Sequence, residues 1–196
     1  AFNQIYKLNL NTLGEMNIAY LGELRTQSRC GRLDQACAFG SKPSLMHFDG
    51  DEIDVKALNI KKHLYWVFAD LCASKDTIRI LSDLNRAYPF AIDEAGRREQ
   101  AALGEKNLDI VNSAVSYMAN GEIESLGRLM TEAESLFNSD VAPMSEALKA
   151  PKLQRTLNDP NILPLVYGGK GVGSHGDGSV QFLARNEECQ LKLVDY

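Results

Sequence analysis

Residue types that build disulfides and structural metal sites are scarce in this chain. Its 196 residues include four cysteines and three histidines. Cys30, Cys37, Cys72 and Cys189 form neither a C-x-x-C pair nor the Cys/His spacing of a zinc site. This scarcity excludes a disulfide-built scaffold and predicts no metal site made of cysteine and histidine. A reduced, cytoplasmic protein is the simplest interpretation.

Long apolar runs and an excess of positive charge are also missing. No run approaches the roughly 20 apolar residues that a membrane-spanning helix needs, and the first residues do not resemble a secretion signal. The 21 Lys and Arg residues are outnumbered by 26 Asp and Glu residues, so the formal net charge is −5. This charge excludes a nucleic-acid surface built on bulk positive charge. We expect neither a membrane nor a nucleic acid as a partner.

Glycine, in contrast, is concentrated in one segment near the C-terminus. The stretch YGGKGVGSHGDGSVQF, residues 167–182, contains Gly168, Gly169, Gly171, Gly173, Gly176 and Gly178. Dense glycines permit positive φ and a close approach to a ligand or a second loop, and successive amides in such a turn can bind an anion. Lys170 is followed by glycine rather than Ser or Thr, so the phosphate-loop pattern G-x-x-x-x-G-K-[ST] is absent. A tight turn between strands is an equally good interpretation of these residues alone.

The N-terminal third of the chain shows both helix and strand patterns. Helix, break and helix are expected over residues 1–27, with Asn11 and Thr12 as a capping signal. A hairpin is expected at residues 44–55, closed by the turn pair Asp49-Gly50. The nearly continuous apolar run of residues 64–69 predicts a buried strand.

Helices dominate the middle of the chain, and strands return near its end. Helices are predicted at residues 75–88 (with Ser74 as N-cap), 97–119 and 122–138 and within 143–157, and strands at 162–167, 179–184 and 191–194. This grouping of helices and strands predicts an α+β fold. The change from strand to helix character lies near residues 71–74, so we expect a domain of residues 1–72 and a second of residues 73–196.

Three segments together resemble motifs of one enzyme superfamily. CGRLDQACAFG, residues 30–40, resembles the CGxMDQ segment of galactokinase-type members of the GHMP small-molecule kinases. GGKGVGSHGDGSVQF, residues 168–182, resembles the third glycine-rich motif of that superfamily, GAKxTGAGGGG. SKDT, residues 74–77, resembles the Ser/Thr-Lys stretch of mevalonate-kinase-like members. The three matches occur in the family's order across nearly the whole chain.

The resemblance implies a two-layer GHMP kinase architecture. Residues 1–72 would be the back portion of the N-terminal domain, which binds ATP and substrate. Residues 73–196 would be the helix-rich C-terminal domain with an antiparallel sheet. The implied enzyme uses ATP and Mg²⁺ to phosphorylate a hydroxyl of a small sugar or sugar-like substrate.

The resemblance also implies roles for residues near the first two motifs. Asp34 would accept the hydroxyl proton or orient the hydroxyl, with Arg32 and Gln35 as substrate-binding neighbours. Ser74 and Lys75, at an expected helix start, would bind an anionic part of the substrate. The residues themselves leave alternatives open. Asp34 can be a helix cap, Gln35 can support the turn, and Ser74 can be a simple N-cap beside a solvated lysine.

For the glycine motif, the resemblance implies a loop that closes against nucleotide and substrate. The candidate contacts are Gly168, Gly169, Lys170, Gly171, Gly173, Ser174, Gly176 and Gly178. Ser174, His175 and Asp177 stand where the family often has small residues. We expect Asp177 to point away from phosphates or to help a metal, because a carboxylate facing phosphates is repelled.

Two earlier motifs of the family do not occur in these residues. They are an N-terminal Pro-Gly segment and the loop P-x-G-L-S-S-S-A, which wraps the ATP phosphates. We therefore expect the back portion of a longer kinase, inactive alone, with the missing N-terminal portion as its partner. A non-catalytic binding or regulatory module that keeps the fold is the alternative. An unrelated α+β fold with a structural glycine loop is a third interpretation.

Overall fold

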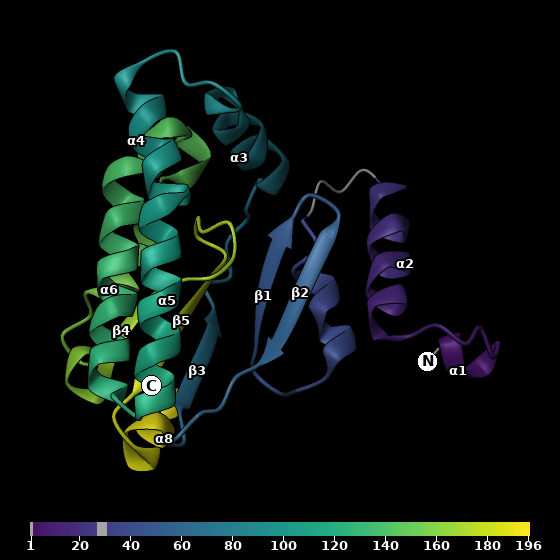
Figure 1. Cartoon of the computed structure of the whole chain (residues 1–196). Coiled ribbons are helices and arrows are strands. Elements are labelled where there is room, and N and C mark those ends of the chain that lie inside the picture. The colour runs from purple at the N-terminus through teal and green to yellow at the C-terminus, as the bar shows by residue number, and fades with distance from the viewer. Residues whose placement is uncertain (1, 27–30) are drawn as a thin grey trace. The chain divides into compact units, whose positions relative to one another are not determined.

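The computed structural model describes residues 2–26 and 31–196, which fold into two compact units (Figure 1). The first unit ends at Leu58 and the second begins at Asn59. Sequence placed the boundary after residue 72. The units divide earlier because the strand formed by residues 65–70 pairs with a strand near the C-terminus and so lies in the second unit. The assignment of the two parts to kinase domains stays a prediction.

The first unit contains helices followed by a β-hairpin. Its elements are α1 (Phe2–Ile5), α2 (Thr12–Leu24), the 3-10 helix η1 (Asp34–Phe39), β1 (Ser44–Asp49) and β2 (Glu52–Ala57). Asn11 caps α2, because its side chain accepts a hydrogen bond from the Gly14 amide at 2.8 Å. The capping signal in the sequence is thus confirmed. The hairpin is confirmed too, but Asp49 pairs with Glu52, so its turn residues are Gly50 and Asp51.

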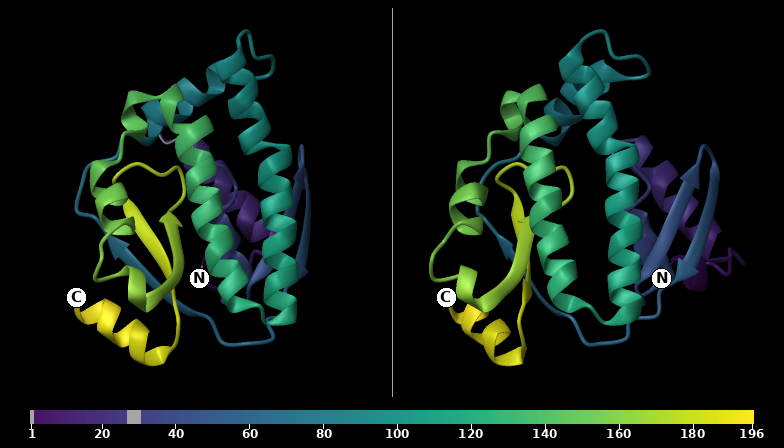
Figure 2. Two further views of the ribbon diagram at one scale, coloured as in Figure 1. Left: turned by 90° about the vertical axis from the view of Figure 1, so that its left-hand side faces the viewer. Right: turned by 60° about the vertical axis from the view of Figure 1, so that its left-hand side comes forward.

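A three-stranded antiparallel sheet is the centre of the second unit. Its strands are β3 (Tyr65–Asp70), β4 (Val166–Gly171) and β5 (Ser179–Ala184), in the order β3-β5-β4. The long helices α5 (Glu105–Asn120) and α6 (Ile123–Asp140) run side by side, and α6 packs on β4 (Figure 2). The left-handed Gly121 ends α5, as the Asn120-Gly121 pair predicts.

Shorter helices complete the second unit. They are α3 (Thr77–Leu84), η2 (Asn85–Ala87), α4 (Glu94–Leu103), η3 (Ala142–Met144), η4 (Glu146–Leu148), α7 (Pro151–Leu157), η5 (Leu163–Leu165) and α8 (Glu187–Asp195). No helix in the described part of the chain is long and apolar enough to cross a membrane. The mixture of helices with antiparallel strands confirms the α+β fold class.

The structure corrects several sequence-based boundaries. Asp76, not Ser74, caps α3, since its carboxylate accepts from the Arg79 amide at 2.9 Å. The helix predicted over residues 97–119 is two helices that meet at Gly104. The strand predicted at 191–194 is wrong. These residues belong to α8, because Asn186 caps a helix there and only Leu193 of its apolar residues is buried.

Both faces of the sheet are apolar, which fixes the helices around it. Val67, Val180 and Phe182 belong to one buried cluster, together with residues of α7 and α8. Leu183 faces the opposite side, where it packs with Trp66 and with residues of α5 and α6. Trp66 is partly buried against this cluster. Only Val67 of β3 is buried, and residues 68–70 are exposed, so the strand predicted as buried is an edge strand of the sheet. The sheet held between these clusters presents the glycine segment at one end of β4 and β5.

Candidate functional site

The segment around Asp34 lies in the first unit, at the start of η1. Asp34 is exposed, whereas Gln35 is buried. The side-chain amide nitrogen of Gln35, oriented toward the preceding backbone, donates to the carbonyls of Gly31 and Arg32, at 3.1 Å each. Gln35 thus supports the turn that presents Asp34. Cys30, the first residue of this motif, lies outside the described residues.

Arg32 is held by neighbours on two sides. Its guanidinium contacts Asp51 Oδ1 at 2.7 Å and lies 4.9 Å from the centre of the Tyr20 ring. These contacts connect the turn to the β1–β2 hairpin and to α2. The observed role of Arg32 is therefore to position the segment that carries Asp34.

In the second unit, the glycine segment is partly strand and partly loop. Gly168, Gly169, Lys170 and Gly171 end β4, and residues 172–178 form the loop before β5. Gly173 and Gly176 adopt φ values of 61° and 69°, and His175 between them has φ 60°. The positive φ values favour glycine at positions 173 and 176, because most other residue types are strained in this conformation.

Glycines within β4 have a different physical reason. A Cβ on Gly168 would collide with the Gly127 carbonyl of α6, and one on Gly169 would collide with the Phe182 ring. A Cβ on Gly171 would lie 2.6 Å from the His175 ring. These glycines allow helix α6 and the loop to approach the strand closely.

The buried carboxylate of Glu134, on α6, fixes the end of β4. Glu134 Oε2 accepts from the Gly171 amide at 2.9 Å and lies 3.3 Å from His175 Nδ1. Oε1 accepts from the Gln154 side chain at 3.0 Å. Burial raises the pKa of Glu134, but the contacts with His175 and the Gly171 amide outweigh it and hold the pKa below its usual range. Glu134 is therefore an ionised anchor for the glycine segment.

Two other polar residues of the loop are also turned inward. His175 is buried, and its ring stacks on Phe137 with centroids 3.6 Å apart. Asp177 Oδ1 accepts from the Leu153 amide at 2.8 Å, in the first turn of α7. Asp177 points into the protein, and its expected position relative to phosphates stays a prediction.

Two lysines flank the loop. Lys75 Nζ lies 3.5 Å from the Val172 carbonyl, and its aliphatic chain runs beside Gly178. Lys170 Nζ donates to the Gly171 carbonyl at 2.8 Å, and burial lowers the pKa of this lysine. The structure brings Lys75 to the glycine segment although 97 residues separate it from Val172. Ser74 is exposed in the same connection before α3.

The described residues offer an anion a suitable environment at this loop. Lys75 and Lys170 supply positive charge, and Gly173 has no atom closer than 4.0 Å to the position of a Cβ, which leaves its backbone accessible. Within residues 2–26 and 31–196, no group of three or more His, Cys, Asp and Glu side chains is arranged to hold a metal ion.

Sequence reasoning missed Glu134 and Gln154. Glu134 occupies an otherwise apolar stripe with Leu126, Met130 and Phe137, at helical spacing. A carboxylate in such a stripe indicates a buried polar contact. Its partners, on β4 and α7, could not be read from that spacing.

Comparison with known proteins identifies the fold. No protein-family model matches the chain, and no curated protein matches its sequence. Among solved structures, L. major mevalonate kinase in complex with R-mevalonate matches 100% of this chain and 56% of its own, with TM-score 0.74 and 18% identity. Lactococcus lactis galactokinase complexed with galactose matches 100% of this chain and 60% of its own, with TM-score 0.64 and 14% identity. The chain thus spans less than two thirds of either kinase.

Proposed function

Because this chain has the fold of mevalonate kinase and galactokinase, members of the GHMP superfamily, we propose that it is part of an ATP-dependent kinase. The kinase would phosphorylate a hydroxyl of a small sugar or sugar-like substrate. The observation that carries this proposal is the match of the whole chain to both kinases. The glycine segment and the Asp34 motif, recognised separately in the sequence, support it.

In this proposal Asp34 accepts the proton of the substrate hydroxyl. A carboxylate can do so when it lies within hydrogen-bond distance of that hydroxyl. Its exposure at the start of η1 supports this role, because a substrate can reach it. Arg32 and Gln35 keep the turn in place through their contacts with Asp51 and with the backbone. Any contact of these two residues with the substrate is part of the proposal.

The glycine segment would contribute to the binding of nucleotide phosphates or substrate. When bound with Mg²⁺, ATP supplies the phosphoryl group. Lys75 would offset negative charge beside the loop, and Ser74 would offer a hydroxyl next to it. The amides of Gly173 and Ser174 would donate to anionic oxygens, whereas the His175 amide already donates to the Val172 carbonyl at 3.2 Å. Lys170 would add positive charge at the base of the loop.

The test uses the full-length protein, including any residues encoded upstream of this chain. ADP release is measured with galactose, mevalonate and a panel of other sugars, for wild type, Asp34→Asn and Asp49→Asn. Asp49 is the matched control because it is an exposed carboxylate of the same unit. We expect Asp34→Asn to abolish turnover while ATP still binds, and Asp49→Asn to stay active. Normal turnover in Asp34→Asn would refute the assignment.

A non-catalytic binding or regulatory module is the second candidate. In this candidate, the P-x-G-L-S-S-S-A loop, which these 196 residues do not contain, would be missing from the full-length protein too. The upstream reading frame separates the two candidates, because that loop belongs immediately before the helices of a complete kinase. Binding of a sugar or nucleotide without ADP release by the full-length protein would support the module.

Location in the cytoplasm is part of the same proposal. Cys37, Cys72 and Cys189 are free thiols. Free thiols persist in a reducing compartment. Labelling the intact protein with a thiol reagent directly after cell lysis would show whether they remain reduced.

A further inference from the structure

A cavity of about 230 Å³ lies in the second unit, between α6, α7 and strand β4. Buried residues form its base, and exposed residues such as Ser135 of α6 form its rim. The volume is below the roughly 300–1,000 Å³ of a cavity for a drug-sized ligand. A molecule built on a single ring therefore matches it in size.

Strand β4 is an edge strand, so every second residue turns its backbone groups away from β5. The Val172 amide donates to the Ser179 carbonyl at 3.2 Å, so the backbone groups of Val172 face β5. By this alternation, Gly169 and Gly171 face the free edge. The Gly171 amide accordingly donates to Glu134, which lines the cavity. The N–H and C=O of Gly169, which also lines the cavity, therefore point to the same side of the strand.

The backbone of Gly169 offers a donor and an acceptor that the protein leaves unused. Gly169 is buried, yet no group among the described residues bonds to its N–H or its C=O. Buried backbone groups without a partner are unfavourable. A carboxamide carries one acceptor and two donors on a single small group. It can accept from the N–H and donate to the C=O of one extended residue, as an added strand does.

The wall opposite β4 is polar and negatively charged. Glu134 Oε1 accepts from the side chains of Asn138 at 3.2 Å and Gln154 at 3.0 Å, and Gln154 also donates to Asn138 at 3.2 Å. These bonds hold the three side chains together at the cavity. None of the described residues that line it is Lys or Arg. An anionic ligand would therefore be repelled by Glu134, whereas an uncharged amide would not.

We propose that this cavity binds a small uncharged carboxamide that carries an aromatic or apolar ring. The amide group pairs with the Gly169 backbone, and the ring lies against Leu157, Val166 and Phe182. This site goes beyond the proposed kinase function and does not depend on it. It is built on β4 rather than on the loop of residues 172–178.

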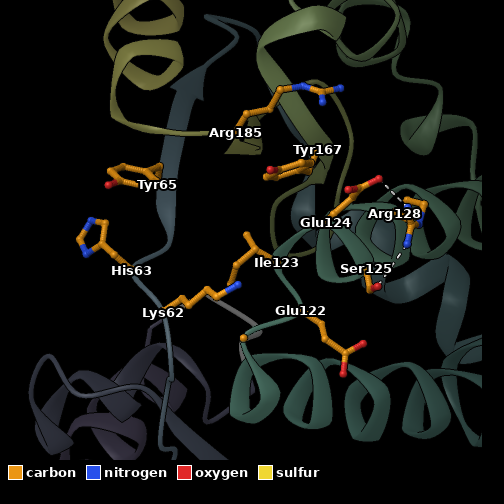
Figure 3. Close-up of a pocket in the computed structure, with 11 residues that line it drawn as sticks. Lys62, His63, Tyr65, Glu122, Ile123, Glu124, Ser125, Arg128, Tyr167 and Arg185 are labelled. Atoms are coloured by element: carbon orange, nitrogen blue, oxygen red, sulfur yellow. Dashed lines mark hydrogen bonds and ion pairs between the residues drawn. The ribbon is translucent and has the colours of Figure 1, made fainter.

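A larger cavity of the second unit, of about 650 Å³, provides the alternative location for such a ligand (Figure 3). It is lined by residues 121–125 and by Tyr65, at the start of β3. In Figure 3, Lys62 and Arg185 lie on opposite sides of the Tyr167 ring, so these cations do not converge on one ligand group. The two locations involve different amides and can be distinguished residue by residue.

Amide NMR titration of the 196-residue protein with benzamide tests the proposal. We expect saturable shift changes at Gly168 and Gly169, with a dissociation constant of about 1 mM, as suits so small a ligand. Benzoate and N,N-dimethylbenzamide keep the ring but lack amide N–H donors. Each should bind about tenfold more weakly than benzamide, because the bond to the Gly169 carbonyl is lost. Binding of either compound as tightly as benzamide would overturn the carboxamide assignment.

A tryptophan at the rim tests the location. Ser135→Trp should abolish benzamide binding, because the larger side chain closes the entrance. Glu132→Trp is the matched control, since Glu132 is exposed on the same helix but does not line the cavity, and it should bind like wild type. Thermal unfolding checks that both variants are folded. The site is refuted if wild type shows no saturable change, if folded Ser135→Trp binds like wild type, or if shifts change only at residues 121–125.

Discussion

At the scale of single residues, buried carboxylates decide how the second unit is held. Glu134 accepts hydrogen bonds from the Gly171 amide and the Gln154 side chain, so its burial is compensated. Glu99, on α4, is fully buried, and neither of its carboxylate oxygens has a hydrogen-bond partner among the described residues. Glutamate thus anchors the glycine segment at position 134, whereas at position 99 its ionised form is destabilised by burial.

Glu99 makes stability depend on pH. Burial raises its pKa from 4.5 to about 7. Because the folded protein holds the proton more tightly than the unfolded chain, stability falls as pH rises from 4.5 to 7. The loss above pH 7 is on the order of 1–3 kcal/mol. We expect Glu99→Gln to flatten this dependence and to raise the unfolding midpoint at pH 8.

Urea unfolding at pH 5 and pH 8 measures this effect. Glu94→Gln is the matched control, since Glu94 is exposed on the same helix. An equal loss of stability between the two pH values in wild type and Glu99→Gln would contradict the role of Glu99.

At the scale of elements, the contact between α6 and β4 determines where the glycine segment lies. Gly127 on the helix and Gly168 on the strand let the two backbones touch. The Glu134 carboxylate, two turns further along α6, then reaches the Gly171 amide. The hydrogen bond from Gly171 to Glu134, which fixes the end of β4, therefore depends on the close packing of α6 on β4.

Replacing Gly168 with alanine should disrupt this contact. The added Cβ would collide with the Gly127 carbonyl, which belongs to helix backbone and cannot turn aside. We expect a loss of about 1–3 kcal/mol in the free energy of unfolding. Gly22→Ala is the control, because Gly22 lies in α2 with no atom within 4 Å of the added methyl. That change should stabilise by up to about 1 kcal/mol. If wild type and Gly168→Ala are equally stable in chemical denaturation, Gly168 does not lie in such close contact with the Gly127 carbonyl.

At the scale of the whole molecule, the two units differ in how much core they hold. Among the described residues, three hydrophobic clusters are found, and all lie within residues 59–196. In the described part of the first unit, Met16 is the single fully enclosed apolar side chain, while Phe2, Ile5 and Tyr6 are exposed. We therefore expect the second unit to fold without contributions from the first.

We predict that residues 59–196 fold alone, and that residues 1–58 do not. Circular dichroism and thermal unfolding of both fragments provide the measurement. The longer fragment should show helical signal and a cooperative transition, because its core is complete. The shorter one should lack a transition, since it buries too little apolar surface. If residues 59–196 unfold without a cooperative transition, this division of the chain is wrong.

Much of the fold, and less of the candidate site, could be predicted from the sequence. The Asn11 cap, the hairpin at Gly50 and the α5 stop at Gly121 depend on neighbouring residues, and all three were predicted. Residues 191–194 were predicted as a strand because an alternating pattern of four residues fits either structure, until Asn186 starts a helix. The glycine segment was recognised, but the strand before it was predicted too early, at residues 162–167. The structure has the 3-10 helix η5 at residues 163–165 and β4 at Val166–Gly171.

The sequence by itself determined the α+β class, the Asn11 cap and the α5 stop at Gly121, and it contains three segments that resemble GHMP kinase motifs. Local propensity, periodicity and turn chemistry need only residues close in the chain, so they can be read without the fold. Tertiary structure alone decided that β3 pairs with β5, that Lys75 meets the glycine loop, and that Glu134 anchors Gly171. It also decided that Gly169 and Gln154 line one cavity. These contacts join residues far apart in the chain, and only the packing of helices against the sheet brings them together.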